Sequence, residues 1–489
     1  MFSDRTKYSA AGSSAFNVSL ELHSINRGRL CERLRKRHDV PEGAFVMLEG
    51  GKEESRYSSD TEDLFRQESY MHWAFGVQEP DCYGAIEVDS GRAIIFMPER
   101  DENYIIWMGK PYPPEHFERR YDVQEVHFFK EDEAKIVEVL KSKDPSVLLR
   151  LKGKNTDSGK FTKPVEFNGI KQFDLNDNIL HHEMTELRVI KTDKEVDVIR
   201  HACCVAGEAH KKMMQQARPR MYELQLEGIF RGYVASRGHR HLAYTPIAGS
   251  GPNSAILHYG HAGSPNNRKM EDGDLVLCDI GSEYYCYASD ITCTFPVNGK
   301  FTDEQKVIFN AVSAANLAVR QRAIVGNKWV ENHQVAERTI LTHLRDYGML
   351  KGEVDDMMQV YLGGVFMPHG VGHFLGIDVH DVGGYPEGAS RSDKPGLRCL
   401  RCVRTLEENM VVTIEPGCYF IDKLMDDALA NPEQRKFINV EVFEKFRGFG
   451  GIRLEDVVAV GRDCAELFAL LPRTPKDVEE LMASDKPEQ

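Results

Sequence analysis

The sequence predicts a mixed α/β protein with two domains, and three observations lead to this fold class. The chain has 489 residues, which is too long for one typical domain. Up to about residue 185, apolar runs of strand length alternate with helical patterns. Beyond it, two long helical patterns stand among segments that read mostly as strand and turn. We therefore expect a small α/β domain over residues 1–184 and a larger domain over residues 185–489.

The predicted small domain is built from short strands and at least one helix. Residues 44–48 form an apolar run that ends at two glycines, which predicts a buried strand. Residues 84–88 and 93–97 flank an Asp-Ser-Gly-Arg turn, a pattern typical of a hairpin. Apolar residues recur at helical spacing over residues 131–143. The sequence of this part shows no cluster of metal-ligating or nucleophilic residues.

Two capping boxes mark the starts of long helices in the larger domain. Thr192 precedes Glu195 by three residues, and apolar residues then recur at helical period. Thr302 and Gln305 form the same box ahead of residues 303–323. We expect one helix to begin near residue 192 and another to span residues 303–323.

Composition excludes several classes of protein. The net charge is −14 and the pI is about 5.7, so binding to nucleic acid or to an anionic membrane through a basic surface is not expected. No window approaches 18 uninterrupted apolar residues, and the N-terminus carries neither a secretory nor a transit pattern. The 11 cysteines form no disulfide or zinc framework, and Cys399 and Cys402 make a lone CxxC. We expect a cytoplasmic protein with reduced thiols.

Residues 367–381 contain three histidines, His369, His373 and His380, among glycines and apolar residues. Histidine is a common metal ligand and acid–base group, and glycines allow close approach of a ligand or another strand. An ordinary core strand with polar edge positions also explains this stretch when it is taken alone. On a helix, His369 and His373 would mimic a zinc-binding pair, but the Gly-rich, strand-like context argues against a helix.

Four carboxylates lie in apolar, β-branched surroundings: Asp279, Asp290, Glu415 and Glu455. Buried acids are rare unless they are paired or metal-bound, although a salt-bridged or strand-edge acid explains any single one of them. Together with His373 they form a hard, oxygen-dominated ligand set. Such a set suits two divalent ions of the Mn, Co or Zn type, and the excess of oxygen favours Mn. Two ions about 3.5 Å apart can bridge a hydroxide and stabilise the oxyanion formed on its attack.

The two aspartates are 11 residues apart, around a Gly-Ser-Glu-Tyr-Tyr connection. If the strands pair as a hairpin centred on Tyr284 and Tyr285, Asp279 and Asp290 face one another across the sheet. A bulge would shift this register, because Tyr-Tyr is a poor two-residue turn.

In their order and local settings, these five residues resemble the dinuclear site of the pita-bread metallopeptidases. Other runs resemble the prolidase branch of that family, which splits Xaa-Pro dipeptides: residues 66–69, 258–263, 289–292, 367–381, 415–417 and 448–453. The resemblance covers nearly the whole chain and implies a pita-bread catalytic domain preceded by a smaller creatinase-like α/β domain.

The resemblance also implies roles for the ligands. Asp290 and Glu455 would bridge two metal ions, Asp279 would complete the shell of one ion, and His373 and Glu415 would complete that of the other. Glu415 would also shuttle a proton from the bridging water to the leaving nitrogen. That nitrogen belongs to proline, has no N–H and accepts a proton only as the bond breaks.

Four further residues are expected to contact or support the substrate. By the resemblance, His258 and His380 contact the substrate and its developing oxyanion, and Arg401 holds the free C-terminal carboxylate. A solvated arginine is the alternative reading of Arg401. We expect His369 to act by hydrogen bonding beside the site.

We therefore expect a manganese-dependent dipeptidase that hydrolyses Xaa-Pro dipeptides by attack of a metal-bridged hydroxide and releases proline, a step of collagen degradation. The alternatives are an Xaa-Pro aminopeptidase acting on longer peptides and a non-catalytic scaffold of the same fold. The family also implies a homodimer in which the small domain serves dimerisation and covers the partner's site. Trp107 is the candidate covering residue.

Overall fold

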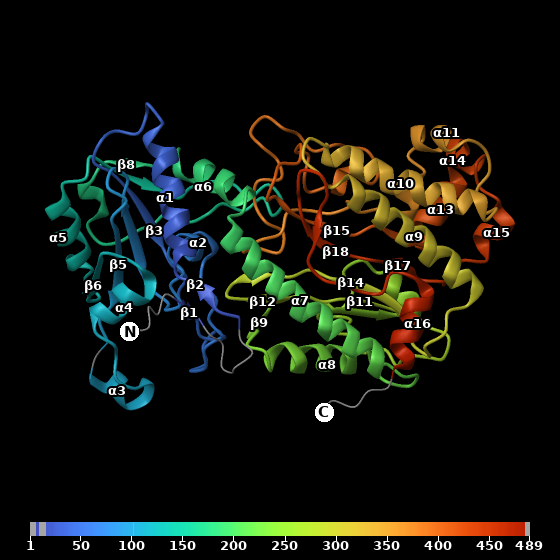
Figure 1. Ribbon diagram of the computed structural model, residues 1–489, viewed down its shortest axis with the longest axis horizontal. Helices are drawn as coiled ribbons and strands as arrows, with labels where there is room; N and C mark the ends of the chain where they lie inside the picture. Colours follow the sequence, from blue (N-terminus) through green and yellow to red (C-terminus); the bar gives the residue numbers. More distant parts are fainter. Residues whose placement is uncertain (1–5, 9–15, 101, 485–489) are drawn as a thin grey trace. The chain divides into compact units, whose positions relative to one another are not determined.

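The computed structural model describes residues 6–8, 16–100 and 102–484. The chain divides into two compact units, one built mainly from Phe16–Glu195 and one mainly from Val196–Gln489. Both contain sheets and helices, so the predicted mixed α/β class is confirmed (Figure 1). No helix in the described part of the chain is long and apolar enough to span a membrane.

A six-stranded mixed sheet forms the centre of the first unit. Its spatial order is β6 (Glu125–Phe129), β5 (Ala93–Pro98), β4 (Tyr83–Glu87), β3 (Ala44–Glu49), β7 (Val147–Arg150) and β8 (Leu175–Asn176). The predicted β4–β5 hairpin is confirmed, with antiparallel pairing that runs from Tyr83 opposite Phe96 to Ile86 opposite Ala93. The pairs β5–β6, β3–β7 and β7–β8 are parallel.

Helices pack on this sheet because its strands bury apolar side chains. One core cluster joins Phe45, Phe96 and Leu148 of the sheet to Ile136 and Leu140 of a helix. The helices of this unit are α1 (Glu21–Arg35), α2 (Ser69–Phe75), α3 (Glu102–Met108), α4 (Pro114–Tyr121), α5 (Ala134–Lys143) and α6 (Leu180–Val189). A separate two-stranded sheet pairs β1 (Thr6–Tyr8) with β2 (Val18–Ser19).

Short antiparallel sheets make up the strand layer of the second unit. Three of them have three strands, in the spatial orders β10 (Ile247–Ser250), β11 (Leu275–Asp279), β14 (Thr292–Pro296); β13 (Tyr287–Ala288), β12 (Ser282–Tyr284), β9 (His241–Leu242); and β15 (Val411–Ile414), β18 (Asp456–Ala459), β19 (Glu466–Leu467). A fourth sheet pairs β16 (Gly417–Tyr419) with β17 (Gly451–Arg453). Each of these strands is two to five residues long.

The predicted register of the aspartate hairpin is wrong. Asp279 pairs with Thr292 rather than with Asp290. The turn lies one residue later than expected, at Tyr285 and Cys286, whose φ angles of 50° and 61° are both left-handed. Two successive left-handed residues form the tight turn that matches the twist of paired strands, so they set the register here.

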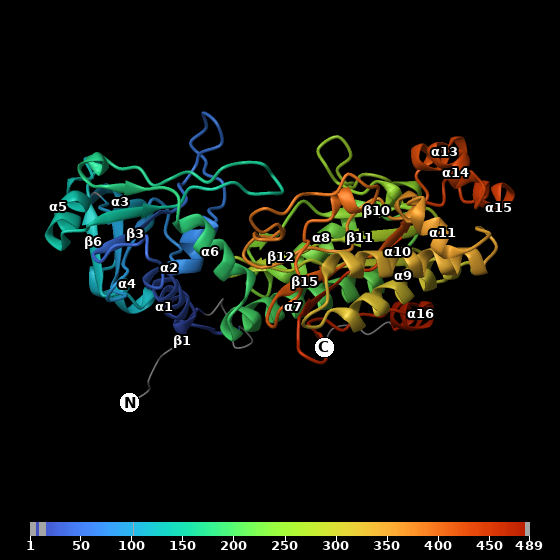
Figure 2. The same ribbon diagram turned by 90° about the horizontal axis from the view of Figure 1, so that it is seen from above.

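Long helices pack around these sheets. They are α7 (Asp193–Gln216), α8 (Glu223–Ala235), α9 (Asp303–Arg322) and α10 (Trp329–Asp346). The shorter helices are α11 (Val354–Gln359), α12 (Gly363–Phe366), α13 (Asp422–Ala430), α14 (Pro432–Arg435), α15 (Val440–Glu444) and α16 (Pro475–Ala483). Both capping boxes are confirmed, since Thr192 and Thr302 each exchange hydrogen bonds with the third helical residue. Helices α9 and α10 lie side by side (Figures 1 and 2).

Candidate metal centre

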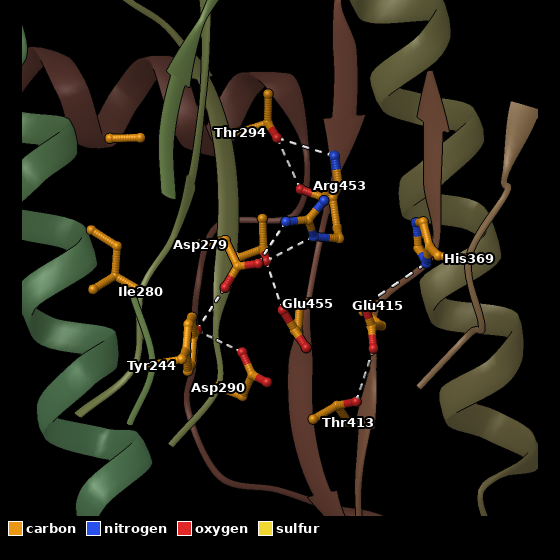
Figure 3. A network of polar contacts seen from close by, with 12 residues as sticks. Tyr244, Asp279, Ile280, Asp290, Thr294, His369, Thr413, Glu415, Arg453 and Glu455 are labelled. Atoms are coloured by element: carbon orange, nitrogen blue, oxygen red, sulfur yellow. Dashed lines mark hydrogen bonds and ion pairs between the residues drawn. The ribbon is translucent and has the colours of Figure 1, made fainter. Parts of the chain in front are cut away.

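The four carboxylates predicted from the sequence lie where strands end or are interrupted. Asp279 is the last residue of β11, and Asp290 lies between β13 and β14. Glu415 separates β15 from β16, and Glu455 separates β17 from β18. Strands from distant parts of the chain converge here, so their ends bring these side chains together (Figure 3).

Residues 371–375, in the middle of the 367–381 stretch, run along β15, and no part of the stretch is a helix or a regular strand. The amide of Thr413 donates to the carbonyl of His373 at 2.9 Å, and that of Glu415 donates to Val371 at 2.8 Å. A side chain at Gly372 would collide with the carbonyl of Thr413, so glycine is required for this approach. The helical zinc-pair alternative is therefore excluded.

His373 is oriented as a ligand by its own backbone. Its Nδ1 lies 2.9 Å from the carbonyl of Phe374 and donates to it, which leaves Nε2 with a lone pair. Nε2 lies 3.3 Å from Asp290 Oδ2 and 3.5 Å from Glu415 Oε1. Ligand atoms of Asp290, His373 and Glu455 all lie within 4.8 Å of one another, and all three residues are buried.

Two residues that were not predicted tie Asp279 to this cluster. The hydroxyl of Tyr244 lies 2.6 Å from Oδ1 of both Asp279 and Asp290. Arg453, which is 4% exposed, donates to Asp279 Oδ2 at 2.6 Å. Arg453 belongs to a run that resembles the prolidases. An arginine inside an apolar strand is the signal in the sequence that could have identified it as a site residue. Tyr244 carried none.

Burial and the repulsion between neighbouring carboxylates disfavour the charged forms of this cluster. Burial raises the pKa of Glu415 to about 7; His373 opposes this rise, and the negative charge of Asp290 adds to it. Burial and the neighbouring carboxylates raise the pKa of Glu455 well above its usual value, and burial raises that of Asp290. A group of buried carboxylates with one oriented imidazole is a donor set that suits divalent cations. The residues present therefore fit a metal centre.

A pocket of about 500 Å³ is lined by the five candidate ligands and also by His258, His369, His380 and Arg401. The rings of His373 and His380 meet edge to face, 4.5 Å apart. His369 donates from Nδ1 to the carbonyl of Gly370 at 2.8 Å, and its Nε2 accepts from the hydroxyl of Tyr419 at 3.0 Å. Burial lowers the pKa of His369 to about 3 and that of His380 to about 2, so both rings are neutral.

Besides Tyr244 and Arg453, the pocket has further residues that were not predicted as site residues, among them a histidine and a cysteine. His261 and Cys399 both line the pocket. His261 belongs to a run that resembles the prolidases, whereas the lone CxxC of Cys399 and Cys402 does not mark Cys399 as a pocket residue. Trp107 lies on α3 in the first unit and is 84% exposed.

The fold and the carboxylate–histidine cluster together define a metallopeptidase. The chain belongs to metallopeptidase family M24, which it matches over residues 197–462, and residues 23–148 match the aminopeptidase P N-terminal domain. It is 51% identical over 473 residues to the Xaa-Pro dipeptidase of Homo sapiens, covering 96% of this chain and 95% of that protein. The Xaa-Pro dipeptidase of Rattus norvegicus is similar to the same extent.

Solved structures support the same assignment. A zinc-substituted Escherichia coli aminopeptidase P in complex with product has a TM-score of 0.76 at 28% identity, covering 96% of this chain and 100% of that chain. Proline aminopeptidase P II from Yersinia pestis gives the same four values. The predicted pita-bread fold and the resemblance to the prolidase branch are therefore confirmed.

Proposed function

We propose that this protein is a metal-dependent dipeptidase that hydrolyses Xaa-Pro dipeptides and releases proline. The observation that carries the proposal is one pocket that holds a buried carboxylate–histidine cluster together with Arg401. Its similarity to the human and rat Xaa-Pro dipeptidases supports the same substrate class.

Two divalent cations, most simply Mn(II), are proposed to bind Asp279, Asp290, His373, Glu415 and Glu455. Bound there, they would supply Lewis acidity and lower the pKa of a water molecule. The proposal is supported by the closely grouped ligand atoms of Asp290, His373 and Glu455 and by the excess of oxygen donors.

Glu415 is proposed to carry the proton. Its carboxylate lines the pocket, and the hydroxyl of Thr413 lies 3.4 Å from its Oε1. In this position it receives a proton from the attacking water and delivers it to the proline nitrogen. His258 and His380 line the same pocket, and we propose that they contact the substrate carbonyl as its negative charge develops. His369 supports them through its bond with Tyr419.

Arg401 is proposed to set the length of the substrate. A guanidinium pairs well with a terminal carboxylate, whereas a longer peptide leaves both groups unpaired. The experiment compares Gly-Pro with Gly-Pro-Ala in the presence of Mn(II), then with a chelator and in Asp290→Ala. We expect strong preference for the dipeptide and loss of turnover with chelator or with Asp290→Ala. In Arg401→Ala, KM for Gly-Pro should rise by about tenfold to a hundredfold.

The second candidate is an Xaa-Pro aminopeptidase acting on longer peptides, which the similarity to aminopeptidase P structures favours. Efficient cleavage of Gly-Pro-Ala would support it and would contradict the role of Arg401. Turnover that survives chelation would contradict the metal mechanism for both candidates.

We also propose that the chain forms a cytoplasmic homodimer, with residues 1–184 serving dimerisation and covering the partner's site, and residues 185–489 serving catalysis. Helix α3 supports this, because Ile105, Ile106, Trp107 and Met108 are all exposed. Apolar side chains grouped in this way are typical of an interaction surface. All 11 cysteines are free thiols, as expected for a reducing compartment. Sedimentation of Trp107→Ala beside the wild type, with KM measured for both, tests the role of α3.

A further inference from the structure

The segment of residues 395–405, here called the Arg401 segment, carries the arginine proposed to read the substrate carboxylate. Its fold is mostly irregular, with one short 3₁₀ turn at Leu397–Cys399. An irregular segment does not by itself hold a guanidinium in one place. The contacts that fix this segment therefore determine the position of the Arg401 guanidinium.

Helix α10 is attached to the C-terminal end of the Arg401 segment. The amide of Trp329 donates to the carbonyl of Arg404 at 3.0 Å, and Lys328 pairs with Thr405 in a β-bridge. The indole nitrogen of Trp329 also donates to the carbonyl of Gly372, in the wall of the pocket, at 3.0 Å. The first turn of α10 thus contacts both the pocket wall and this end of the segment.

One and two turns further along α10, a buried pair contacts the other end of the segment. His333 Nε2 lies 3.4 Å from Glu337 Oε1, and the side chains are 0% and 6% exposed. Both His333 nitrogens and Glu337 Oε1 lack a hydrogen bond within the described part of the chain. A Cβ atom at Gly396 would lie 2.8 Å from Glu337 Oε1 and 3.0 Å from His333 Nε2. Gly396 therefore rests directly against the polar ends of this pair.

The chain between these two attachments is closely packed around Arg401. A Cβ atom at Gly370 would lie 2.9 Å from Leu400 Cα, and one at Gly384 would collide with the carbonyl of Arg401. The carbonyl of Leu400 accepts from the hydroxyl of Tyr385 at 2.7 Å. With such packing, a shift at Gly396 is transmitted to Arg401 rather than absorbed.

We propose that His333 and Glu337 are positioning residues for Arg401, holding the Gly396 turn so that the guanidinium meets the carboxylate of a dipeptide. This rests on the proposed role of Arg401. A buried pair of polar side chains is weak evidence for stability, since apolar residues of similar volume often serve as well. His333 and Glu337 place polar atoms at defined positions against Gly396. A flexible apolar side chain would not do so.

The test uses Gly396→Ala, Glu337→Ala and the double variant, with KM and kcat measured for Gly-Pro and for Gly-Pro amide, which lacks the carboxylate. Gly396→Ala should raise KM for Gly-Pro by roughly tenfold to a hundredfold while kcat changes much less, and Glu337→Ala should raise it to a smaller extent. The amide should be little affected. The double variant, which removes Glu337 Oε1 from the path of the new methyl group, should recover part of the loss.

Gly388→Ala is the matched control, because Gly388 also has a positive φ, +81° against +76° at Gly396, but a Cβ atom there would have nothing within 4 Å. The proposal is overturned if Gly396→Ala keeps the wild-type KM, if Gly388→Ala is equally impaired, or if the double variant recovers nothing. Should Gly396→Ala fail to fold, an unchanged KM in Glu337→Ala also overturns it. A wild type that cleaves the amide as well as Gly-Pro contradicts the role of Arg401 itself.

Discussion

The hydroxyl of Tyr244 lies between two of the candidate ligands, Asp279 and Asp290. It is 2.6 Å from Asp279 Oδ1 and 2.6 Å from Asp290 Oδ1, and so fixes how both carboxylates point. Groups that orient ligands in this way typically contribute tenfold to a hundredfold in metal affinity. Tyr244→Phe should therefore weaken Mn(II) binding by about that factor, measured by calorimetric titration of metal-free protein.

A tyrosine outside the site provides the control for this measurement. The hydroxyl of Tyr83, in the first unit, donates to Glu133 at 2.7 Å. Tyr83→Phe removes a similar hydrogen bond and should leave Mn(II) affinity unchanged. Equal affinities in Tyr244→Phe and the wild type would show that Tyr244 does not orient the ligands.

His23 makes the first unit sensitive to mild acid. Burial lowers its pKa from 6.5 to about 3, and Nδ1 donates to the carbonyl of Trp73 at 3.1 Å. Folding favours the neutral ring, so its contribution to stability is complete above pH 6.5 and is lost as the pH falls toward 3. At pH 5 the loss should be about 2 kcal/mol. Hydrogen exchange across α1 measures it.

His23→Asn tests this assignment, because asparagine keeps a donor for Trp73 but does not titrate. Between pH 7.5 and pH 5, the variant should lose about 2 kcal/mol less stability than the wild type. If both lose the same amount, the acid sensitivity lies in other groups.

At the scale of single elements, α9 depends on its first turn. The amide of Gln305 donates to Thr302 Oγ1 at 3.2 Å, and the amide of Thr302 donates to Gln305 Oε1 at 2.9 Å. Thr302→Ala removes the cap and should cost about 1 kcal/mol of unfolding free energy, measured by urea denaturation. Thr302→Ser keeps the hydroxyl and should lose much less. Equal losses would point to the methyl group instead.

Elements with local signals were predictable from the sequence, and those set by distant contacts were not. Capping residues predicted the starts of α7 and α9, and two apolar runs separated by a turn predicted β4 and β5. The register around Tyr285 and Cys286 depends on left-handed φ angles in residues that carry no turn signature.

The candidate site divides in the same way. Carboxylates in apolar runs are visible in the sequence because burial makes them unusual. Arg453 meets Asp279 across 174 residues, so that contact exists only once the fold has brought two strand ends together. In the sequence, Tyr244 is an ordinary aromatic residue, and only the fold brings Asp279 and Asp290 to its hydroxyl. The residue types predicted which side chains belong to the cluster, whereas the topology of the fold determines which residues they contact.

At the scale of the whole molecule, metal should stabilise one unit and not the other. All candidate ligands belong to the second unit, and the first unit supplies none. Free Mn(II) at a hundred times its Kd should stabilise the second unit by about 2.7 kcal/mol. Hydrogen exchange should slow across α9 and stay unchanged across α1. Equal slowing in both helices would mean that the units unfold together.

The distribution of the candidate ligands along the chain also has a consequence for biogenesis. They extend from Asp279 to Glu455, close to the C-terminal end of the second unit. A nascent chain that has left the ribosome only as far as Glu415 exposes Asp279, Asp290 and His373 but still lacks Glu455. Contacts between such distant segments form late, after the long intervening loop has closed. Metal loading should therefore wait until Glu455 has been synthesised, so that the ligand set is completed only after most of the second unit has left the ribosome.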